Sequence, residues 1–301
     1  MRFSRMLALG ASMLVLLSAC STGGGSKPTI KIGSVGFDEA RVVAEIYAQA
    51  LEANGYAVDR AGIGLGNRKV LLPALESGQI DLQPEYVGSG LAYYGGAPEG
   101  HADTNKELFA DALKAKGLAI SILDYTPGED TNAFVVRKET ADQFGISKLS
   151  EIGAVQDQLK WAFATDCPTN PLCAAALKAA YDIAPKDVTL LDACSGPMAE
   201  ALLQKTVDVA ELCSTQPEII TNAWVILDDD RATQPADSIV PLVRDDLLAK
   251  VDKAAFSKIL NDISEKIDTP TLGQLYYDVA VGKKDIKDVA SAWLKANGFV
   301  K

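Results

Sequence analysis

The sequence contains little histidine and fewer basic than acidic residues. Its single histidine, His101, cannot supply the pair of imidazole ligands that histidine-based metal sites require. The 29 lysines and arginines are outnumbered by 40 aspartates and glutamates, which gives a formal net charge of −11. An acidic protein of this kind disfavours nucleic acids and anionic lipid headgroups as partners. We therefore expect no nucleic-acid partner and no metal site.

The motifs of several enzyme classes are also missing. The chain has no G-x-S-x-G elbow, no Walker A motif and no H-E-x-x-H pair. Residues 62–66 read G-x-G-x-G rather than the dinucleotide-binding G-x-G-x-x-G, and we interpret them as a tight turn at the rim of a cleft. No pattern brings Glu39 and Glu85 to the spacing of a catalytic acid pair. The sequence predicts that the protein is not an enzyme and needs no cofactor.

An apolar stretch near the N-terminus is too short to cross a membrane comfortably. It spans residues 6–17, follows Arg2 and Arg5, and is typical of a secretory signal over residues 1–19. Cleavage there would change the net charge from −11 to −13, since it removes two arginines and no acid. We predict that the mature protein is exported.

The end of this signal has a second property. Leu17-Ser18-Ala19-Cys20 resembles the lipobox of bacterial lipoproteins, in which cleavage precedes a cysteine that is then lipidated. A Gly/Ser-rich segment follows, so residues 20–28 are expected to be lipidated Cys20 and a flexible tether. The resemblance implies a protein anchored to the membrane through Cys20; the alternative is a soluble secreted protein whose Cys20 is incidental.

Four further cysteines are Cys167, Cys173, Cys194 and Cys213. In an exported protein an even number predicts disulfides, and four cysteines allow three pairings. Their spacing lacks the C-x₂-C pairs of zinc sites. Cys167 and Cys173 bracket a short loop, whereas Cys194 and Cys213 each follow the end of a predicted strand. We predict the pairs Cys167–Cys173 and Cys194–Cys213.

After the tether, strand and helix patterns alternate. Residues 29–34 alternate apolar and polar side chains as a strand does, and residues 38–51 place apolar side chains at helical spacing. A strand over 56–60, a helix over 67–76 and a strand over 80–82 follow. This order predicts an α/β fold with parallel strands.

The second half repeats the order. Strands are expected over 160–165, 188–192, 207–212 and 224–227, with helices over 170–181 and 197–204. A shift of 127 residues places Ile80-Asp81-Leu82 on Val207-Asp208-Val209 and Tyr86 on Cys213. We predict two similar lobes: residues 29–131 plus 237–301 in lobe 1, and 132–236 in lobe 2. Helices over 247–266 and 289–296 would return to lobe 1.

Ligands of open parallel sheets bind beyond the carboxyl ends of the strands. The segments at those ends are 34–39, 62–68 and 84–90 in the first lobe, and 166–170, 194–197 and 213–217 in the second. Two lobes that face each other would place these segments around one cleft.

Some of these segments resemble a known family. Ile32-Gly33-Ser34, with Phe37 and Glu39, is similar to the first strand and loop of osmoprotectant substrate-binding proteins, the receptors for glycine betaine, choline and related quaternary amines in ABC importers. The block from residue 74 to 82, followed by Pro84-Glu85-Tyr86-Val87-Gly88, resembles the most recognisable part of that family. Segments 163–166, 207–209, 214–215 and 241–247 continue the likeness in order, so it covers nearly the whole mature chain.

The resemblance implies a periplasmic-binding-protein fold of type II, a two-lobe venus flytrap with two chain crossings. It also implies an aromatic cage, because a quaternary ammonium donates no hydrogen bonds and is stabilised by cation–π attraction. A carboxylate tail would be held by hydroxyls and helix N-termini. The candidate ligand-binding residues are Ser34, Phe37, Glu39, Tyr86, Gly88, Asn132, Asp166, Ser214, Thr215 and Asp237.

The chain departs from the family pattern at the cage. Tyr86 carries over as a wall, but three places where the family often has tyrosine hold Asn132, Cys213 and Ala236 or Asp237. Either another aromatic residue substitutes, with Phe37, Tyr93, Tyr94 and Tyr125 as candidates, or the ligand is not a simple quaternary amine.

The predicted function is that of a receptor. We expect a lipid-anchored monomer that delivers a small quaternary amine or zwitterion, similar to glycine betaine or choline, to the permease and ATPase of an ABC importer. A receptor for another small polar cation or an amino acid derivative is the main alternative. An exported enzyme, or a sensor or adhesion lipoprotein, would be a protein of another class.

Overall fold

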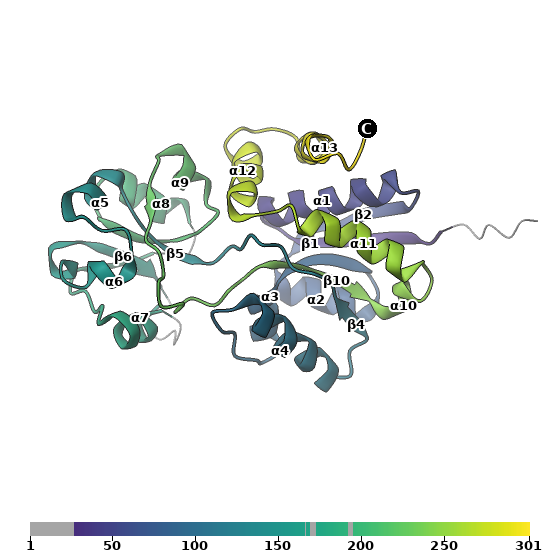
Figure 1. Cartoon of the computed structure of the whole chain (residues 1–301), viewed down its shortest axis with the longest axis horizontal. Coiled ribbons are helices and arrows are strands. Elements are labelled where there is room, and N and C mark those ends of the chain that lie inside the picture. The colour runs from purple at the N-terminus through teal and green to yellow at the C-terminus, as the bar shows by residue number, and fades with distance from the viewer. Residues whose placement is uncertain (1–26, 166, 169–172, 192–194) are drawn as a thin grey trace, which may run out of the picture.

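The computed structural model describes residues 27–165, 167–168, 173–191 and 195–301. The expected signal peptide, Cys20, Asp166 and Cys194 lie outside these residues. Figure 1 shows two lobes joined by two chain segments. Each lobe is built around a five-stranded sheet with helices on its faces, which is the predicted two-lobe α/β architecture.

The first sheet has the strand order β2-β1-β3-β10-β4. β1 pairs in parallel with β2 and β3, whereas β10 runs antiparallel to β3 and β4. The strands are β1 (Thr29–Val35), β2 (Ala57–Gly66), β3 (Leu82–Tyr86), β4 (Ile120–Ile122) and β10 (Ile239–Arg244). The C-terminal part of the chain therefore returns to the sheet that the N-terminal part began.

Amphipathic helices cover both faces of this sheet (Figure 1). They are α1 (Asp38–Ala53), α2 (Arg68–Ser77), α3 (Val87–Tyr93), α4 (Ala102–Ala115), α10 (Asp245–Leu248), α11 (Lys253–Ser264), α12 (Thr269–Ala280) and α13 (Ile286–Ala296). α1 buries Val42, Val43, Ile46 and Tyr47 against the lobe 1 core and packs on α11, α12 and α13. The burial of this apolar face is what holds the helix in place.

The second sheet has the order β7-β6-β8-β5-β9. β6 is parallel to β7 and β8, and β5 is antiparallel to β8 and β9. The strands are β5 (Asn132–Val136), β6 (Trp161–Ala164), β7 (Val188–Leu191), β8 (Val209–Cys213) and β9 (Val225–Ile226). The helices are α5 (Lys138–Phe144), α6 (Leu149–Ile152), the 3₁₀ turn η1 (Gln156–Gln158), α7 (Ala174–Tyr181), α8 (Gly196–Leu203) and α9 (Pro217–Thr221).

The two sheets have the same plan. Each pairs three parallel strands with an antiparallel strand that arrives from a chain crossing. The 127-residue shift lays β3 onto β8 from end to end, with Leu82 on Val209 and Tyr86 on Cys213. The short internal match in the sequence thus marks equivalent strands in two similar lobes.

Two local predictions were wrong. Residues 62–66 belong to β2 rather than to a turn; Gly64 and Gly66 have φ of 74° and 156°, and the pairing with β1 shifts register there. The helical pattern over 247–266 is divided into α10 and α11, because the side chain of Asp252 accepts a hydrogen bond from Ala255 N and starts a new helix. Hydrophobic periodicity predicted neither feature, because one depends on strand pairing and the other on a helix cap.

A disulfide joins Cys167 to Cys173 in lobe 2, with a Cα–Cα distance of 5.1 Å. This is the pairing expected across the short loop. Cys213 is also disulfide-bonded. Its expected partner, Cys194, lies outside the described residues, so that pairing stays a prediction.

Candidate ligand site

The centre of the candidate site is a buried acid–aromatic cluster on lobe 1. Glu39 is in the first turn of α1, and Tyr86 ends β3. The hydroxyl of Tyr86 donates a 2.6 Å hydrogen bond to Oε1 of Glu39, and both side chains are almost fully buried. Phe37, just before α1, lies against the ring of Tyr86 with a centroid distance of 5.7 Å and is 40% exposed. Phe37 is therefore the more accessible of the two aromatic faces.

Residues from the first chain crossing and from lobe 2 reach the same cluster. Thr215 follows β8, and its hydroxyl donates a 2.8 Å hydrogen bond to Oδ1 of Asp130, in the crossing between β4 and β5. Asp130 and Thr215 both influence the ionisation of Glu39, which places them beside it. The cluster thus joins lobe 1, the crossing and lobe 2.

The second crossing adds another carboxylate. Asp237 accepts hydrogen bonds from the backbone N–H groups of Gly88 and Ser89, at 2.8 and 2.9 Å, and from the Ser89 hydroxyl at 2.6 Å. A carboxylate at the start of α3 suits the unpaired N–H groups there. These contacts fix the second crossing to the first turn of α3.

Burial raises the pKa values of the acids in this region. Desolvation, assisted by the charge of Asp130, raises the pKa of Glu39 to about 8, while the hydroxyls of Thr215 and Tyr86 oppose the rise. Desolvation likewise raises the pKa of Asp237 to about 7, against the hydrogen bonds from Ser89. Desolvation also raises the pKa of Asp130 to about 6. The region therefore holds several buried carboxyl groups whose pKa values lie above their usual range.

A neighbouring ion pair separates Glu85 from this cluster. Arg68, at the start of α2, contacts Oε1 of Glu85 at 2.9 Å, and the same oxygen accepts the backbone N–H of Tyr86. Glu85 and Glu39 therefore have different side-chain partners, an arginine for Glu85 and a tyrosine hydroxyl for Glu39. Arg68 and Ser89 were not among the predicted site residues, although they lie in the segments expected at the strand ends.

Two of the predicted site residues line a cavity rather than belong to the buried cluster. Asn132 and Ser214 line a cavity of about 310 Å³, together with Glu129, Asp229 and Gln234 from the two crossings. The hydroxyl of Ser214 accepts a hydrogen bond from Thr131 N at 3.0 Å. The lining of this cavity includes none of Phe37, Glu39 and Tyr86. The predicted site residues are therefore divided between the buried cluster and the cavity.

Other candidates are used within a lobe or lie elsewhere. The hydroxyl of Ser34 accepts a hydrogen bond from Gly64 N and donates one to Val35 O, so it links β1 to β2. Tyr94 packs against Phe109, and Tyr125 donates a hydrogen bond to Asp103. Of the four proposed substitutes for the cage, Phe37 is the one that contacts Tyr86.

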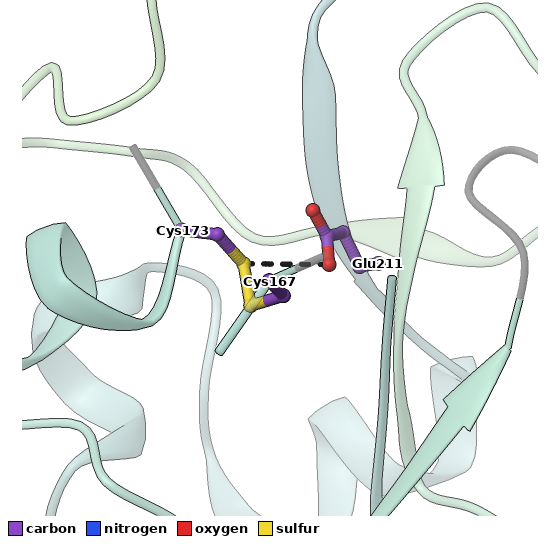
Figure 2. A group of neighbouring side chains, drawn as sticks. All are labelled: Cys167, Cys173 and Glu211. Atoms are coloured by element: carbon purple, nitrogen blue, oxygen red, sulfur yellow. Dashed lines mark hydrogen bonds between the residues drawn. A yellow bond between two sulfur atoms is a disulfide. The ribbon is translucent and has the colours of Figure 1, made fainter. Parts of the chain in front are cut away.

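The disulfide of lobe 2 has an acidic neighbour. Figure 2 shows Glu211 of β8 facing the disulfide, with Oε2 3.4 Å from Sγ of Cys173. Among the described residues, these are the side chains of histidine, cysteine, aspartate and glutamate that lie close enough to share a metal ion. Two of the three are joined in the disulfide, and metal binding by cysteine requires the thiolate. Oxidised in this way, the group is a structural feature of the lobe 2 core.

Comparisons with known proteins agree with this architecture. Residues 28–296 match the model of a family described as the substrate-binding domain of the ABC-type glycine betaine transport system. The glycine betaine-binding protein YehZ of Escherichia coli is 25% identical over 98% of this chain and 99% of its own length. The carnitine transport binding protein OpuCC of Listeria monocytogenes is 27% identical over 95% of this chain and 93% of its own length.

A solved structure shows the same fold. The crystal structure of a glycine betaine/carnitine/choline ABC transporter matches with a TM-score of 0.80 at 20% identity, over 90% of this chain and 99% of that chain. Within the part of the chain that the structure describes, no helix is long and apolar enough to span a membrane. Since the family model extends over residues 28–296, the chain belongs to the family of substrate-binding domains of ABC-type glycine betaine transport systems.

Proposed function

We propose that this protein is the solute receptor of an ABC importer and that it binds a small zwitterion or amine, related to glycine betaine and choline, between its two lobes. The observation that carries the proposal is the acid–aromatic cluster of Phe37, Glu39 and Tyr86, which Asp130 and Thr215 join from the crossing and lobe 2. Aromatic faces and carboxylates both attract a cationic nitrogen. A group that contacts both lobes would favour their closure.

The remaining predicted residues would complete the ligand site. Asn132 and Ser214 line the cavity beside the crossings and would contact the polar end of a ligand that reaches it. Asp237 holds the first turn of α3 in position through Gly88, and Asp166, which lies outside the described residues, is kept as a proposed ligand contact. Ser34 would act indirectly, by fixing β1 to β2.

The cellular setting is part of the proposal. Cys20 would be lipidated after removal of residues 1–19, so that a monomeric receptor hangs from the membrane and meets its permease and ATPase there. Its lobes would comprise residues 29–131 plus 237–301 and residues 132–236. A Cys20→Ala variant should leave the membrane fraction or fail to mature; unchanged processing and membrane association would contradict the anchor.

A binding role is also proposed in preference to catalysis. Glu85, the acid that would have completed a pair with Glu39, is bound to Arg68. His101 precedes α4 and is exposed. We therefore expect no turnover of any ligand that the protein binds.

A second candidate ligand class is supported by Glu39. A small polar cation or amino acid derivative with hydrogen-bond donors would suit a buried carboxylate better than a methylated nitrogen does. This class remains a receptor ligand, so the same fold and partners apply.

The receptor proposal is tested by a ligand screen on the mature chain. Glycine betaine, choline, carnitine and amino acids are added one at a time, and the melting temperature is measured with and without each compound. At a hundred times its Kd, a ligand adds about 2.7 kcal/mol to the free energy of unfolding, which is easily seen as a shift in Tm. Conversion of a stabilising compound into product would instead support the enzyme alternative.

A further inference from the structure

One oxygen of Glu39 has no hydrogen-bond donor among the described residues. Oε1 accepts the hydroxyl of Tyr86, but Oε2 is buried without a partner. The side chain as a whole is 0% exposed. The nearby hydroxyl of Thr215 lowers the pKa of Glu39, but its one proton is donated to Oδ1 of Asp130 at 2.8 Å. When Glu39 is ionised, Oε2 is a buried acceptor without a donor, which is unfavourable, so the ionised form requires a donor that the described residues do not supply.

The groups that face Glu39 supply no positive charge. They come from several elements and are Tyr86 of β3, Asp130 and Asp237 of the crossings, Thr215 after β8 and Tyr276 of α12. The nearest arginines have other partners: Arg68 contacts Glu85, and Arg41 contacts Asp38 at 2.8 Å. A cation that entered this region would therefore meet carboxyl groups and phenols and little competing charge.

A metal ion does not fit these carboxyl groups. The described side chains that lie close enough to share a metal are Cys167, Cys173 and Glu211, in lobe 2. Glu39, Asp130 and Asp237 do not converge in this way. The missing partner of Glu39 is better supplied by an organic cation that carries its own N–H donor.

We propose, on the basis of the receptor function above, that the cationic nitrogen of the ligand bears at least one N–H, which it donates to Oε2 of Glu39, and that a fully methylated nitrogen binds less tightly. A quaternary nitrogen offers charge but no donor, so Oε2 would stay without a partner in its complex. A protonated tertiary, secondary or primary amine offers both. Phe37 and Tyr86 would contact the alkyl groups of the same nitrogen.

Binding of such a cation is accompanied by loss of a proton. Burial and the charge of Asp130 raise the pKa of Glu39 to about 8, so at pH 7 this carboxyl is mostly protonated before the ligand arrives. The cation stabilises the carboxylate, and the carboxyl proton leaves to solvent while the ligand keeps its own N–H. Affinity for the cation therefore rises as the pH increases from 6 to 8, provided that the amine stays protonated.

Matched pairs of ligands test this inference directly. N,N-dimethylglycine differs from glycine betaine by one N–H in place of an N–CH₃, and dimethylethanolamine differs from choline in the same way. Titration calorimetry of the mature chain at pH 7 should give an affinity at least about tenfold higher for the N–H member of each pair. Repetition in phosphate and in Tris should show about one proton released per ligand bound.

A variant of Glu39 identifies the acceptor. Glu39→Gln removes the charge and the titrating proton, so the preference within each ligand pair should fall below about threefold and proton release should cease. Glu52→Gln is the matched control, because Glu52 lies on the same helix, is exposed and contacts Arg60. The control should keep the wild-type preference and the wild-type proton release.

The outcomes separate the inference from the receptor function. If glycine betaine and choline bind the wild-type chain as tightly as their N–H counterparts, or more tightly, the inference is overturned while the receptor function stands. If none of the four amines binds, both are contradicted. The comparison within the wild-type chain needs no variant, so misfolding of Glu39→Gln would not decide it.

Discussion

The two lobes carry different chemistry on the same scaffold. Their sheets have equivalent strand orders, and Tyr86 at the end of β3 corresponds to Cys213 at the end of β8. Lobe 1 places a buried phenol and the acid Glu39 at this position. Lobe 2 places a disulfide-bonded cysteine there, followed by Ser214 and Thr215. In the proposed function, the scaffold sets where the chain approaches the ligand, and the side chains of lobe 1 provide most of the selectivity for a cation.

The lobes also differ in how their cores are built. Lobe 1 has one continuous hydrophobic cluster that includes α1, β1, β3, β10 and the C-terminal helices. The core of lobe 2 is divided between the two faces of its sheet, with Trp161 and Phe163 on one face and Ala162 and Met198 on the other. The Cys167–Cys173 disulfide lies in the first of these clusters. A smaller, divided core gains more from a covalent link.

The largest effect is expected from opening a cavity in one lobe at a time. Trp161 is fully buried in lobe 2, where its ring contacts Phe163 and its indole N–H donates to Gln156 O at 3.1 Å. Trp161→Ala should lower the free energy of unfolding by about 3–5 kcal/mol. Phe109→Ala, in lobe 1, should cost about 3–5 kcal/mol as well.

Scanning calorimetry distinguishes the two variants. If the lobes have separate cores, Trp161→Ala should lower the temperature of an unfolding transition that belongs to lobe 2. Phe109→Ala should lower the temperature of one that belongs to lobe 1. A single transition whose temperature both variants lower equally would show that the lobes unfold as one unit. That result would contradict the view that the lobes have separate cores.

A smaller loss is expected from removal of the lobe 2 disulfide. The double variant Cys167→Ser/Cys173→Ser restores the freedom of the unfolded chain and should lower the free energy of unfolding by about 2–3 kcal/mol. The serine hydroxyls of the variant would donate hydrogen bonds to the neighbouring carboxylate of Glu211, which limits the loss of stability. Urea denaturation, monitored by tryptophan fluorescence, measures the change. An unaltered midpoint would show that the disulfide does not stabilise lobe 2 relative to lobe 1.

Binding should depend on the aromatic residue that lobe 2 lacks. Tyr86→Ala removes a ring that supports Phe37 and also deprives Glu39 of a donor, so the affinity for a stabilising amine should fall more than tenfold, or about 2 kcal/mol. Tyr86→Phe should cost less, because the ring remains. Calorimetric titration checks both, with Tyr93→Ala as a control at an exposed tyrosine outside the cluster. Wild-type affinity in Tyr86→Ala would place the ligand elsewhere.

The smallest effects concern two helix caps in similar places. The side chain of Asn67 accepts Lys69 N at 3.0 Å at the start of α2, and that of Ser195 accepts Met198 N at 3.3 Å at the start of α8. Asn67→Ala and Ser195→Ala should each lower the free energy of unfolding by about 1 kcal/mol. Asn67→Asp keeps an acceptor and should be close to neutral. Chemical denaturation would reveal any larger loss, which would indicate a role beyond capping.

Much of the fold could be predicted from local pattern. β1 and α1 begin where alternation and helical spacing begin, and the internal match at Tyr86 and Cys213 located equivalent strand ends. The extension of β2 through Gly66 could not be predicted, since a glycine-rich segment reads as a turn unless a neighbouring strand pairs with it. The pairing with β1 is formed only in the tertiary structure.

The candidate site was predictable as a set of segments and not as a set of contacts. Glu39 and Tyr86 are 47 positions apart, Asp130 and Thr215 are 85 apart, and Ser89 and Asp237 are 148 apart. No periodicity connects residues at such separations. The omission of Asp130 follows from this, because its role depends on the loop of another lobe that folds against it.

The amino-acid sequence alone determined the alternation of strands and helices, the repetition of one α/β unit and the acids and aromatic residues available at the strand ends. The tertiary structure decided which of those acids are buried away from solvent. Glu39 and Glu52 lie on the same helix, but Glu39 is covered by Tyr86 and the residues around Thr215, whereas Glu52 faces solvent beside Arg60. The free energy of a charge depends on the solvent and charges around it, and for Glu39 distant segments of the chain supply that environment.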